Sequence, residues 1–279
     1  MPVAISPLRE HIGAEATGID LSRPIDPDDA AALRRAFVES AVLVVRDQSL
    51  DAPGFLGATA IFGEPMRQHL TKFNLPDCPD VATISNQEKT EDGRVNVRGV
   101  SWHTDHSFQP EPPKATALYA VALPGAGGDT EWAHMGAAYD ALPDALRTDV
   151  DGLEAVHAYT ESRLPPNLAE RIAAGEDDAA DGVVHPLIRT HPETGRRSIY
   201  LNPLRVRRFR GMTPERCADL IDALVRHATQ PDFVYRHRWR LGDMVIWDNR
   251  SCIHKGNPDY DFQELRLLYR VILAGEKPR

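Results

Sequence analysis

Three residues in this 279-residue chain have side chains and a spacing that suit one transition-metal ion. His103 and Asp105 are two positions apart, and on an extended strand such residues project from the same face. His254 comes much later, after an apolar segment that ends in polar residues. Two imidazoles and one carboxylate on one side of a metal leave positions open for oxygen activation at Fe(II). His-x-Asp alone is a weak motif, but together with His254 it favours a metal site over surface side chains.

Two arginines near the C-terminus predict a cavity that receives a carboxylate. Arg266 and Arg270 are four positions apart in an apolar run at 265–273, so on a strand both guanidinium groups lie on one face. Burying them is costly unless they meet anions. A dicarboxylate such as 2-oxoglutarate would supply these anions, and arginine binds carboxylates through paired N–H groups. The alternative, exposed arginines or arginines paired with Asp or Glu, fits the apolar run less well.

Helical signals that could help to position these residues occur in three segments. The clearest begin at Asp26-Pro27 and at Thr213-Pro214, where a capping side chain precedes a proline. A third helix is expected over residues 53–61. Cys217 falls on the apolar face of the helix after Thr213, so we expect it in the core and not as a nucleophile.

Short segments with the composition of β-strands outnumber the helices, and most are bounded by Gly, Pro, Asn or Asp. Helices do not separate them regularly, as a parallel βαβ sheet would require. The sequence therefore predicts one domain, residues 1–279, mainly β with flanking helices, built as a sandwich or jelly roll. The expected strands are 41–46, 81–85, 115–123, 183–189, 198–201, 233–236, 244–247 and 265–273.

The overall composition narrows the functional classes. The chain has 41 acidic and 32 basic residues, a formal net charge of −9, which argues against nucleic acid as a partner. Three widely spaced cysteines without a CxxC pair suit a reducing compartment. The N-terminus lacks a signal peptide, and no apolar run approaches the roughly 18 residues of a membrane span. We expect a cytoplasmic protein that acts on a small molecule without a membrane partner.

Short motifs also extend along almost the whole chain in a characteristic order. They lie at 5–8, 13–15, 18–21, 45–48 and 62–64, followed by WHTD at 102–105, GGDT at 127–130, HP at 191–192, WDNR at 247–250, His254, Arg266 and Arg270. This set resembles the taurine and 2,4-dichlorophenoxyacetate dioxygenase family of Fe(II)/2-oxoglutarate enzymes. The resemblance implies a double-stranded β-helix (jelly roll) core.

The resemblance also implies roles for individual residues. His103, Asp105 and His254 would hold Fe(II) as metal ligands and catalytic residues. Thr130 and Arg266 would bind the distal carboxylate of 2-oxoglutarate, with Arg270 near its metal-bound end. The implied reaction consumes 2-oxoglutarate and O2 and releases succinate and CO2. Asp105 stands where related halogenases carry a small residue, which favours hydroxylation.

The substrate pocket is the least specific part of the resemblance. His69, Tyr159 and Arg205 fall near positions that line the pocket in relatives, and Phe108 would pack against the carbon skeleton of the substrate. The positive charge predicts a small anionic substrate. Gly99 replaces an asparagine of the taurine enzymes, which argues against taurine. The alternatives are a loop position for His69, a core position for Tyr159 and a solvated basic run for Arg205.

Two other functional classes fit the same three ligands. A zinc hydrolase also uses two histidines and a carboxylate, but it has no need for two arginines that bind a dicarboxylate. A non-catalytic binding protein on the same fold is the other alternative, and the intact ligand set argues against it. The sequence leaves the oligomeric state open, with a homo-oligomer as one option.

Overall fold

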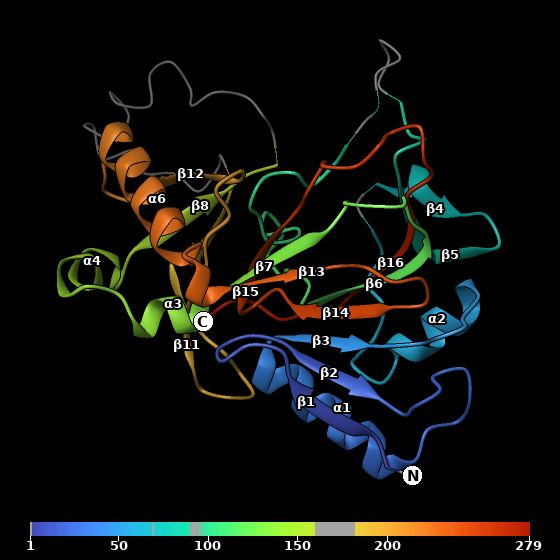
Figure 1. Ribbon diagram of the computed structural model, residues 1–279. Helices are drawn as coiled ribbons and strands as arrows, with labels where there is room; N and C mark the ends of the chain where they lie inside the picture. The colour runs from blue at the N-terminus through green and yellow to red at the C-terminus, as the bar shows by residue number, and fades with distance from the viewer. Residues whose placement is uncertain (1, 69, 90–94, 96, 160–181) are drawn as a thin grey trace.

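The computed structural model describes residues 2–68, 70–89, 95, 97–159 and 182–279. Its framework is an eight-stranded sheet in the order β1-β2-β3-β14-β6-β16-β5-β4, in which only the β2–β3 pair is parallel (Figure 1). The strands of this large sheet are β1 (Ala4–Pro7), β2 (Ala14–Thr17), β3 (Val42–Val45), β14 (Met244–Asp248), β6 (Ala115–Ala122), β16 (Leu267–Leu273), β5 (Cys78–Ser85) and β4 (Asn74–Leu75).

Three smaller sheets complete the β structure of the described residues. The most important for the site is β13-β7-β15, formed by Val234–His237, Thr130–His134 and Cys252–Gly256, with both pairs antiparallel. The other two are β12-β8-β9, formed by Val206–Phe209, Glu154–His157 and Val183–Pro186, and the pair β10-β11, formed by Ile188–Thr190 and Arg197–Ile199.

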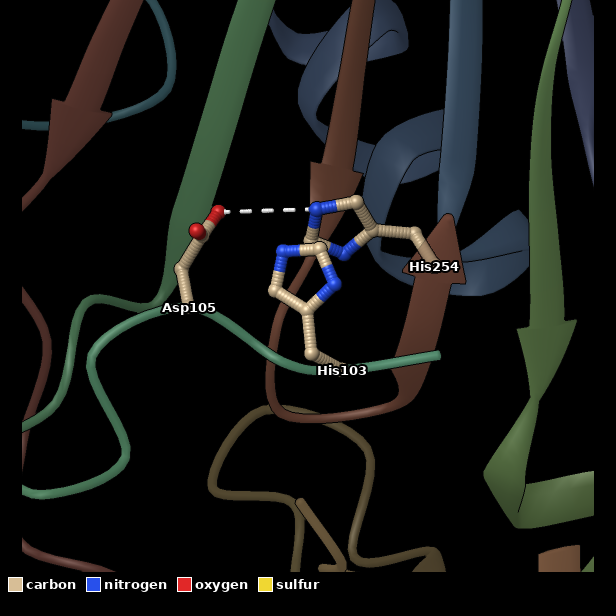
Figure 2. A group of neighbouring side chains, drawn as sticks. All are labelled: His103, Asp105 and His254. Atoms are coloured by element: carbon tan, nitrogen blue, oxygen red, sulfur yellow. Dashed lines mark ion pairs between the residues drawn. The ribbon is translucent and has the colours of Figure 1, made fainter. Parts of the chain in front are cut away.

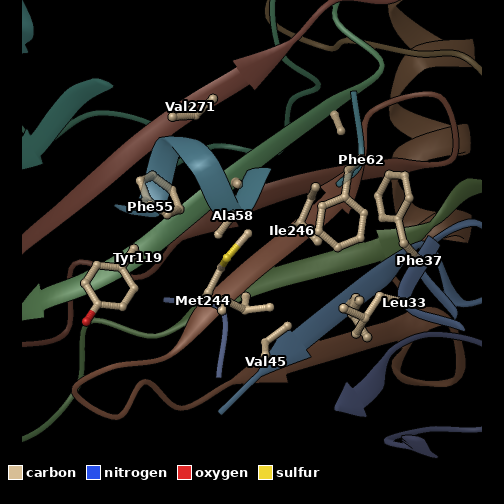
Figure 3. Close-up of a cluster of buried hydrophobic side chains, with 14 of the residues drawn as sticks. Leu33, Phe37, Val45, Phe55, Ala58, Phe62, Tyr119, Met244, Ile246 and Val271 are labelled. Atoms are coloured by element: carbon tan, nitrogen blue, oxygen red, sulfur yellow. The ribbon is translucent and has the colours of Figure 1, made fainter. Parts of the chain in front are cut away.

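Alternating side chains give the large sheet two buried faces. On β3, Leu43 and Val45 pack in the cluster beneath helices α1 (Pro27–Ser40) and α2 (Ala52–Thr59). Figure 3 shows this layer, in which Phe37 and Phe55 from the two helices lie over the strands. Each such fully buried side chain contributes roughly 1.5–3 kcal/mol through the hydrophobic effect. The helices therefore support the sheet that contains β16, which carries Arg270 and directly follows Arg266.

The opposite face of the large sheet packs against the small sheet β13-β7-β15. Val42 and Val44 belong to this second cluster, together with Trp247 of β14 and Trp132 of β7. The two indole rings are 5.5 Å apart between centroids and are both buried. Two facing, mainly antiparallel sheets with helices outside confirm the prediction of a mainly β jelly-roll core.

Helices that begin with a capping side chain start where the sequence predicts them. Asp26 caps α1 through the backbone N–H of Asp28, and Thr213 caps α6 (Pro214–Ala228) through that of Arg216. Cys217 is buried in the third core cluster, as expected. The sequence analysis missed the short helices, which have few turns to show a period: α3 (Met135–Asp140), α4 (Asp144–Val150), η1 (Thr71–Phe73) and η3 (Pro231–Phe233).

One predicted strand is divided. The segment expected as a single strand at 183–189 forms β9 and β10, which belong to different sheets. Pro186 ends β9, and a proline cannot donate a hydrogen bond that would continue the ladder. Leu187 instead donates its backbone N–H to Leu153. The chain therefore turns between the two sheets at Leu187.

His157 on β8 is fully buried, and neither of its ring nitrogens has a hydrogen-bond partner. Burial, with a smaller effect of His185, lowers the pKa of His157 to about 3. In the unfolded chain this histidine binds a proton near its ordinary pKa of about 6.5. The unfolded state therefore binds more protons in this range, and stability falls as the pH drops from about 6.5 toward 3.

We expect the free energy of unfolding to be lower at about pH 5 than at about pH 7. His157 contributes up to about 1.4 kcal/mol for each pH unit below its unfolded pKa. Urea unfolding of the native chain and of His157→Phe at both pH values measures this contribution. The difference between the two pH values should be smaller in His157→Phe, and an equal difference would assign the pH dependence to other groups.

Candidate metal centre

His103, Asp105 and His254 converge in the structure, with their side chains turned toward one another (Figure 2). One ligand atom from each lies within 4.8 Å of the others. His254 Nε2 is 3.9 Å from Asp105 Oδ2, and the two imidazole centroids are 4.2 Å apart. Ligand bonds of about 2.0–2.2 Å place two ligands of one ion at most about 4.4 Å apart. The three groups therefore need little movement to share an ion.

A backbone bridge places the two histidines side by side. The N–H of His103 donates to the carbonyl of His254 over 2.9 Å, and the N–H of His254 donates back over 2.7 Å. His254 follows the expected strand 244–247, and it lies within β15, a strand that the sequence analysis did not expect. The expectation of one strand carrying the whole His-x-Asp pair is wrong, because His103 makes an isolated bridge and Asp105 lies in a turn. The turn, and not strand alternation, brings the carboxylate to the imidazoles.

Both imidazoles are in the neutral form that binds metals. His103 Nδ1 is 2.8 Å from the carbonyl of Ser101, so Nδ1 carries the hydrogen and Nε2 presents a lone pair. Desolvation lowers the pKa of His103, and burial with the neighbouring His103 ring lowers that of His254 well below its ordinary value. Neither ring therefore has to lose a proton before it binds an ion near neutral pH.

Asp105 is ionised and held from two sides. Thr116 Oγ1 donates to Oδ2 over 2.6 Å, and Arg270 Nη2 donates to Oδ1 over 2.7 Å. Although burial raises the pKa of Asp105, the Arg270 guanidinium beside it holds that pKa well below its usual range. Two neutral imidazoles and a carboxylate form a donor set that fits Fe(II). The residues present therefore suit the metal that the sequence predicts.

A cavity of about 230 Å³ opens above these three side chains, between the two facing sheets. Most of the predicted site residues line it, and His69 lies outside the described residues. The predicted residues in the wall are His103, Asp105, His254, Thr130, Arg266, Arg270, Phe108, Tyr159 and Arg205.

Arg266 is a buried charge at one end of this cavity. Its Nε and Nη2 donate to the carbonyl of Gly128 over 3.1 and 2.9 Å, and no carboxylate of the described residues lies within ion-pair distance. Thr130 lies in the same wall, and its hydroxyl oxygen accepts from Trp239 Nε1 over 3.0 Å. Among the described residues, this buried guanidinium meets a neutral carbonyl and the Tyr260 ring, 5.9 Å from its centroid, and no anion, so it calls for one. This end of the cavity therefore suits a carboxylate.

The other predicted pocket residues form an aromatic and cationic group. Arg205 Nη1 donates to the carbonyl of Tyr159 over 2.6 Å, and its guanidinium lies 4.8 Å from the centroid of that ring. The rings of Phe108 and Tyr159 are 4.8 Å apart. Among the described residues, no carboxylate forms an ion pair with Arg205. This wall combines apolar area with positive charge.

The sequence analysis missed one further arginine in the cavity wall. Arg98 lines the cavity, donates to Glu88 Oε1 over 2.7 Å and lies 3.8 Å from the centroid of the Phe73 ring. Its position five residues before His103 belongs to no motif, so only the fold brings it to the site. Because its charge is paired with Glu88, Arg98 adds hydrogen-bond donors to the pocket but no net charge.

Known proteins are similar to this chain over most of their length. The family model "Taurine catabolism dioxygenase TauD, TfdA family" matches residues 4–272. The alpha-ketoglutarate-dependent 2,4-dichlorophenoxyacetate dioxygenase of Cupriavidus pinatubonensis is 34% identical, covering 97% of each chain. The alpha-ketoglutarate-dependent sulfate ester dioxygenase of Pseudomonas putida is 35% identical, covering 98% of this chain and 90% of the relative.

A solved structure agrees with the sequence relatives. AAD-2, crystallised in complex with Mn(II) and N-oxalylglycine, superposes with a TM-score of 0.80 at 30% identity, covering 100% of this chain and 99% of the other. Agreement in sequence, fold and length confirms the resemblance seen in the motifs. The chain belongs to the TauD, TfdA family of alpha-ketoglutarate-dependent dioxygenases.

Proposed function

We propose that His103, Asp105 and His254 hold Fe(II) and that the chain hydroxylates a small anionic molecule in the cavity above them. The observation that carries this proposal is the convergence of two neutral imidazoles and one carboxylate in a cavity with a buried, unpaired Arg266. When bound, the iron supplies the redox chemistry that couples O2 to oxidation of 2-oxoglutarate and substrate. A zinc hydrolase would leave Arg266 without a function.

We propose that Arg266 and Thr130 bind the distal carboxylate of 2-oxoglutarate. The hydroxyl oxygen of Thr130 accepts from the indole of Trp239, so its own hydrogen can be donated to a carboxylate. Arg266 can turn its guanidinium from the Gly128 carbonyl to the same group, which replaces a neutral acceptor by an ionised one. Arg270 lies next to Asp105, so it would adjoin the end of the cosubstrate nearest the metal.

We propose that the substrate is an anion with an apolar body. Arg205 would bind the anionic group, while Phe108 and Tyr159 pack against carbon atoms. His69, predicted for the same role as Arg205, lies outside the described residues. Two relatives are named for a phenoxyacetate and for a sulfate ester, which are both anions. Positive charge beside aromatic rings supports the same class here.

Other expectations from the sequence stay predictions. A single domain over residues 1–279, a cytoplasmic location and the absence of nucleic-acid and membrane partners are proposed from the sequence alone. Among the described residues, no helix has the length and apolar character needed to cross a membrane. A homo-oligomer stays one option for the assembly.

A substrate screen tests the proposed reaction. The purified chain would be supplied with Fe(II), 2-oxoglutarate and O2 and offered phenoxyacetates, alkyl sulfates and sulfonates, including taurine. Succinate should form in step with an oxidised product for at least one anion and should require all three additions. Hydrolysis of an ester with Zn(II), without succinate formation, would support the hydrolase alternative instead.

Arg205→Gln should weaken binding of the substrate that this screen identifies. A lost charge-assisted hydrogen bond costs about 1.5–3 kcal/mol, so the Michaelis constant for the substrate should rise about tenfold or more. The constant for 2-oxoglutarate should not change. Arg210→Gln is a matched control, because Arg210 is half exposed and pairs with Glu154. If the native chain and Arg205→Gln have the same Michaelis constant for the substrate, Arg205 is not part of the substrate site.

A further inference from the structure

Asp105 is the proposed ligand that backbone pairing fixes least. His103 and His254 are joined by their bridge, but Asp105 lies beyond it in a turn. Its backbone N–H reaches the side-chain oxygen of Asn249 at 3.4 Å. Arg270 donates a hydrogen bond to one carboxylate oxygen, Oδ1. Acting alone, this bond would turn the Asp105 carboxylate toward β16. The orientation of this carboxylate must therefore depend on side chains behind it.

A chain of buried hydrogen bonds leads from Trp247 to Asp105. Trp247 Nε1 donates to Asn249 Oδ1 over 3.0 Å, and Asn249 Nδ2 donates to Thr116 Oγ1 over 3.0 Å. Thr116 Oγ1 in turn lies 2.6 Å from Asp105 Oδ2. All four side chains are buried, and Thr116 pairs with Trp247 across the β6–β14 ladder. The turn that holds Asp105 is thereby tied to the centre of the large sheet.

The direction of every bond in this chain is fixed by chemistry. An indole nitrogen can only donate, so the oxygen of the Asn249 amide must face Trp247 and its NH2 group must face Thr116. A threonine hydroxyl has one hydrogen, and Thr116 already accepts from Asn249. Thr116 therefore donates its hydrogen to Asp105. The carboxylate receives this bond on Oδ2, the oxygen that faces His254.

We propose that Asn249 is a positioning residue for the metal centre, which it serves through Thr116. The inference rests on the proposed function, because it takes Asp105 as a metal ligand. Thr116 and Arg270 each occupy one carboxylate oxygen, and each oxygen keeps a further lone pair. With both bonds in place the carboxylate faces the two imidazoles before any ion arrives. Without the bond from Thr116, only Arg270 would set its direction.

A pair of substitutions at Thr116 tests this proposal. Thr116→Val keeps the shape and removes the hydroxyl, whereas Thr116→Ser keeps the hydroxyl. The affinity of the metal-free chain for Mn(II), followed by the electron paramagnetic resonance signal of the free ion, is the readout. Loss of a partner behind a metal ligand costs about 10- to 100-fold in affinity. Thr116→Val should therefore bind Mn(II) at least about tenfold more weakly, and Thr116→Ser close to the native chain. Native affinity in Thr116→Val would overturn the proposal.

Substitutions at Asn249 test whether it acts through Thr116. Asn249→Ala should also lower the affinity for Mn(II). The double variant Asn249→Ala/Thr116→Val should bind Mn(II) with about the same affinity as the single variant that binds it less tightly. Gln48→Ala is the matched control, because Gln48 is another buried amide with several hydrogen bonds, outside the cavity wall. It should lose stability and keep its Mn(II) affinity. The proposal would be overturned if the fold-loss of Mn(II) affinity in the double variant were the product of the two single losses. It would also be overturned if Gln48→Ala lost as much affinity as Asn249→Ala.

The same measurements separate this inference from the proposed function. If the native chain binds Mn(II) and His254→Ala does not, the metal centre is established whatever Thr116→Val does. If His254→Ala binds Mn(II) as the native chain does, the metal centre itself is wrong, and the role of Asn249 falls with it. If Asn249→Ala fails to fold, the Mn(II) affinities of Thr116→Val and Thr116→Ser still test whether the Thr116 hydroxyl orients Asp105.

Discussion

Alanine at position 103, 105 or 254 is expected to reduce succinate formation to background while the chain stays folded. The three side chains supply the only group of metal-ligating residues that converges in the described part of the chain. Each removal leaves two donors, too few for the facial arrangement that holds Fe(II). Metal content by elemental analysis and turnover at near-stoichiometric Fe(II) measure the effect. Full activity in His103→Ala, Asp105→Ala or His254→Ala would exclude that residue from the site.

Two further variants sharpen this prediction. Removing the carboxylate of Asp105 leaves Arg270 without its ion-pair partner, and breaking a buried pair is strongly destabilising. Asp105→Asn keeps the shape and an acceptor for Arg270, so it is the better test of ligation in a folded chain. His106→Ala is the control, because His106 lines the cavity but is not one of the three ligands. It should keep one bound metal ion per chain.

Arg266→Ala is expected to raise the Michaelis constant for 2-oxoglutarate about tenfold or more. The variant loses a charge-assisted bond to the distal carboxylate, which is worth about 1.5–3 kcal/mol, and each 1.4 kcal/mol corresponds to a factor of ten. Consumption of 2-oxoglutarate at varied concentration measures the constant. An unchanged constant would move the role to another residue, and Arg270 would be the first to test.

The burial of Arg266 predicts a second, opposite effect. Its guanidinium meets a neutral carbonyl, and burial lowers its pKa, so the charge destabilises the chain when no anion is bound. Arg266→Met fills a similar volume without a charge. It should unfold at the same or a higher temperature than the native chain, and yet show the same loss of 2-oxoglutarate binding. Loss of both stability and binding in Arg266→Met would indicate a structural arginine.

The sequence predicted those parts of the site that depend on local pattern. Arg266, directly before β16, and Arg270 within it both line the cavity, because side chains four positions apart in an extended segment share one face. Capping residues located α1 and α6, and apolar β-branched runs located the central strands β3 and β14. In each case the signal lies within a few neighbouring residues.

Other parts could not be predicted from local pattern. Strand β7 reads Thr-Glu-Trp-Ala-His, in which glutamate and alanine weaken the β signal, and its partners on both sides supply the pairing. Asn249 is separated from Thr116 by 133 positions, so no spacing rule connects them. The WDNR motif contributed to the family resemblance, but it gave no indication that its asparagine lies behind a ligand. Such contacts exist only after folding.

The bridge between His103 and His254 has a consequence for how this framework can diversify. Two reciprocal backbone hydrogen bonds join residues 151 positions apart, since 254 − 103 = 151. The spacing of the imidazoles therefore depends on one rung of a ladder and not on the length of chain between them. Loops within that stretch, which carry Phe108, Tyr159 and Arg205, can be lengthened or exchanged without moving the histidines. New substrate preferences can therefore arise in these loops while the two histidines keep their positions.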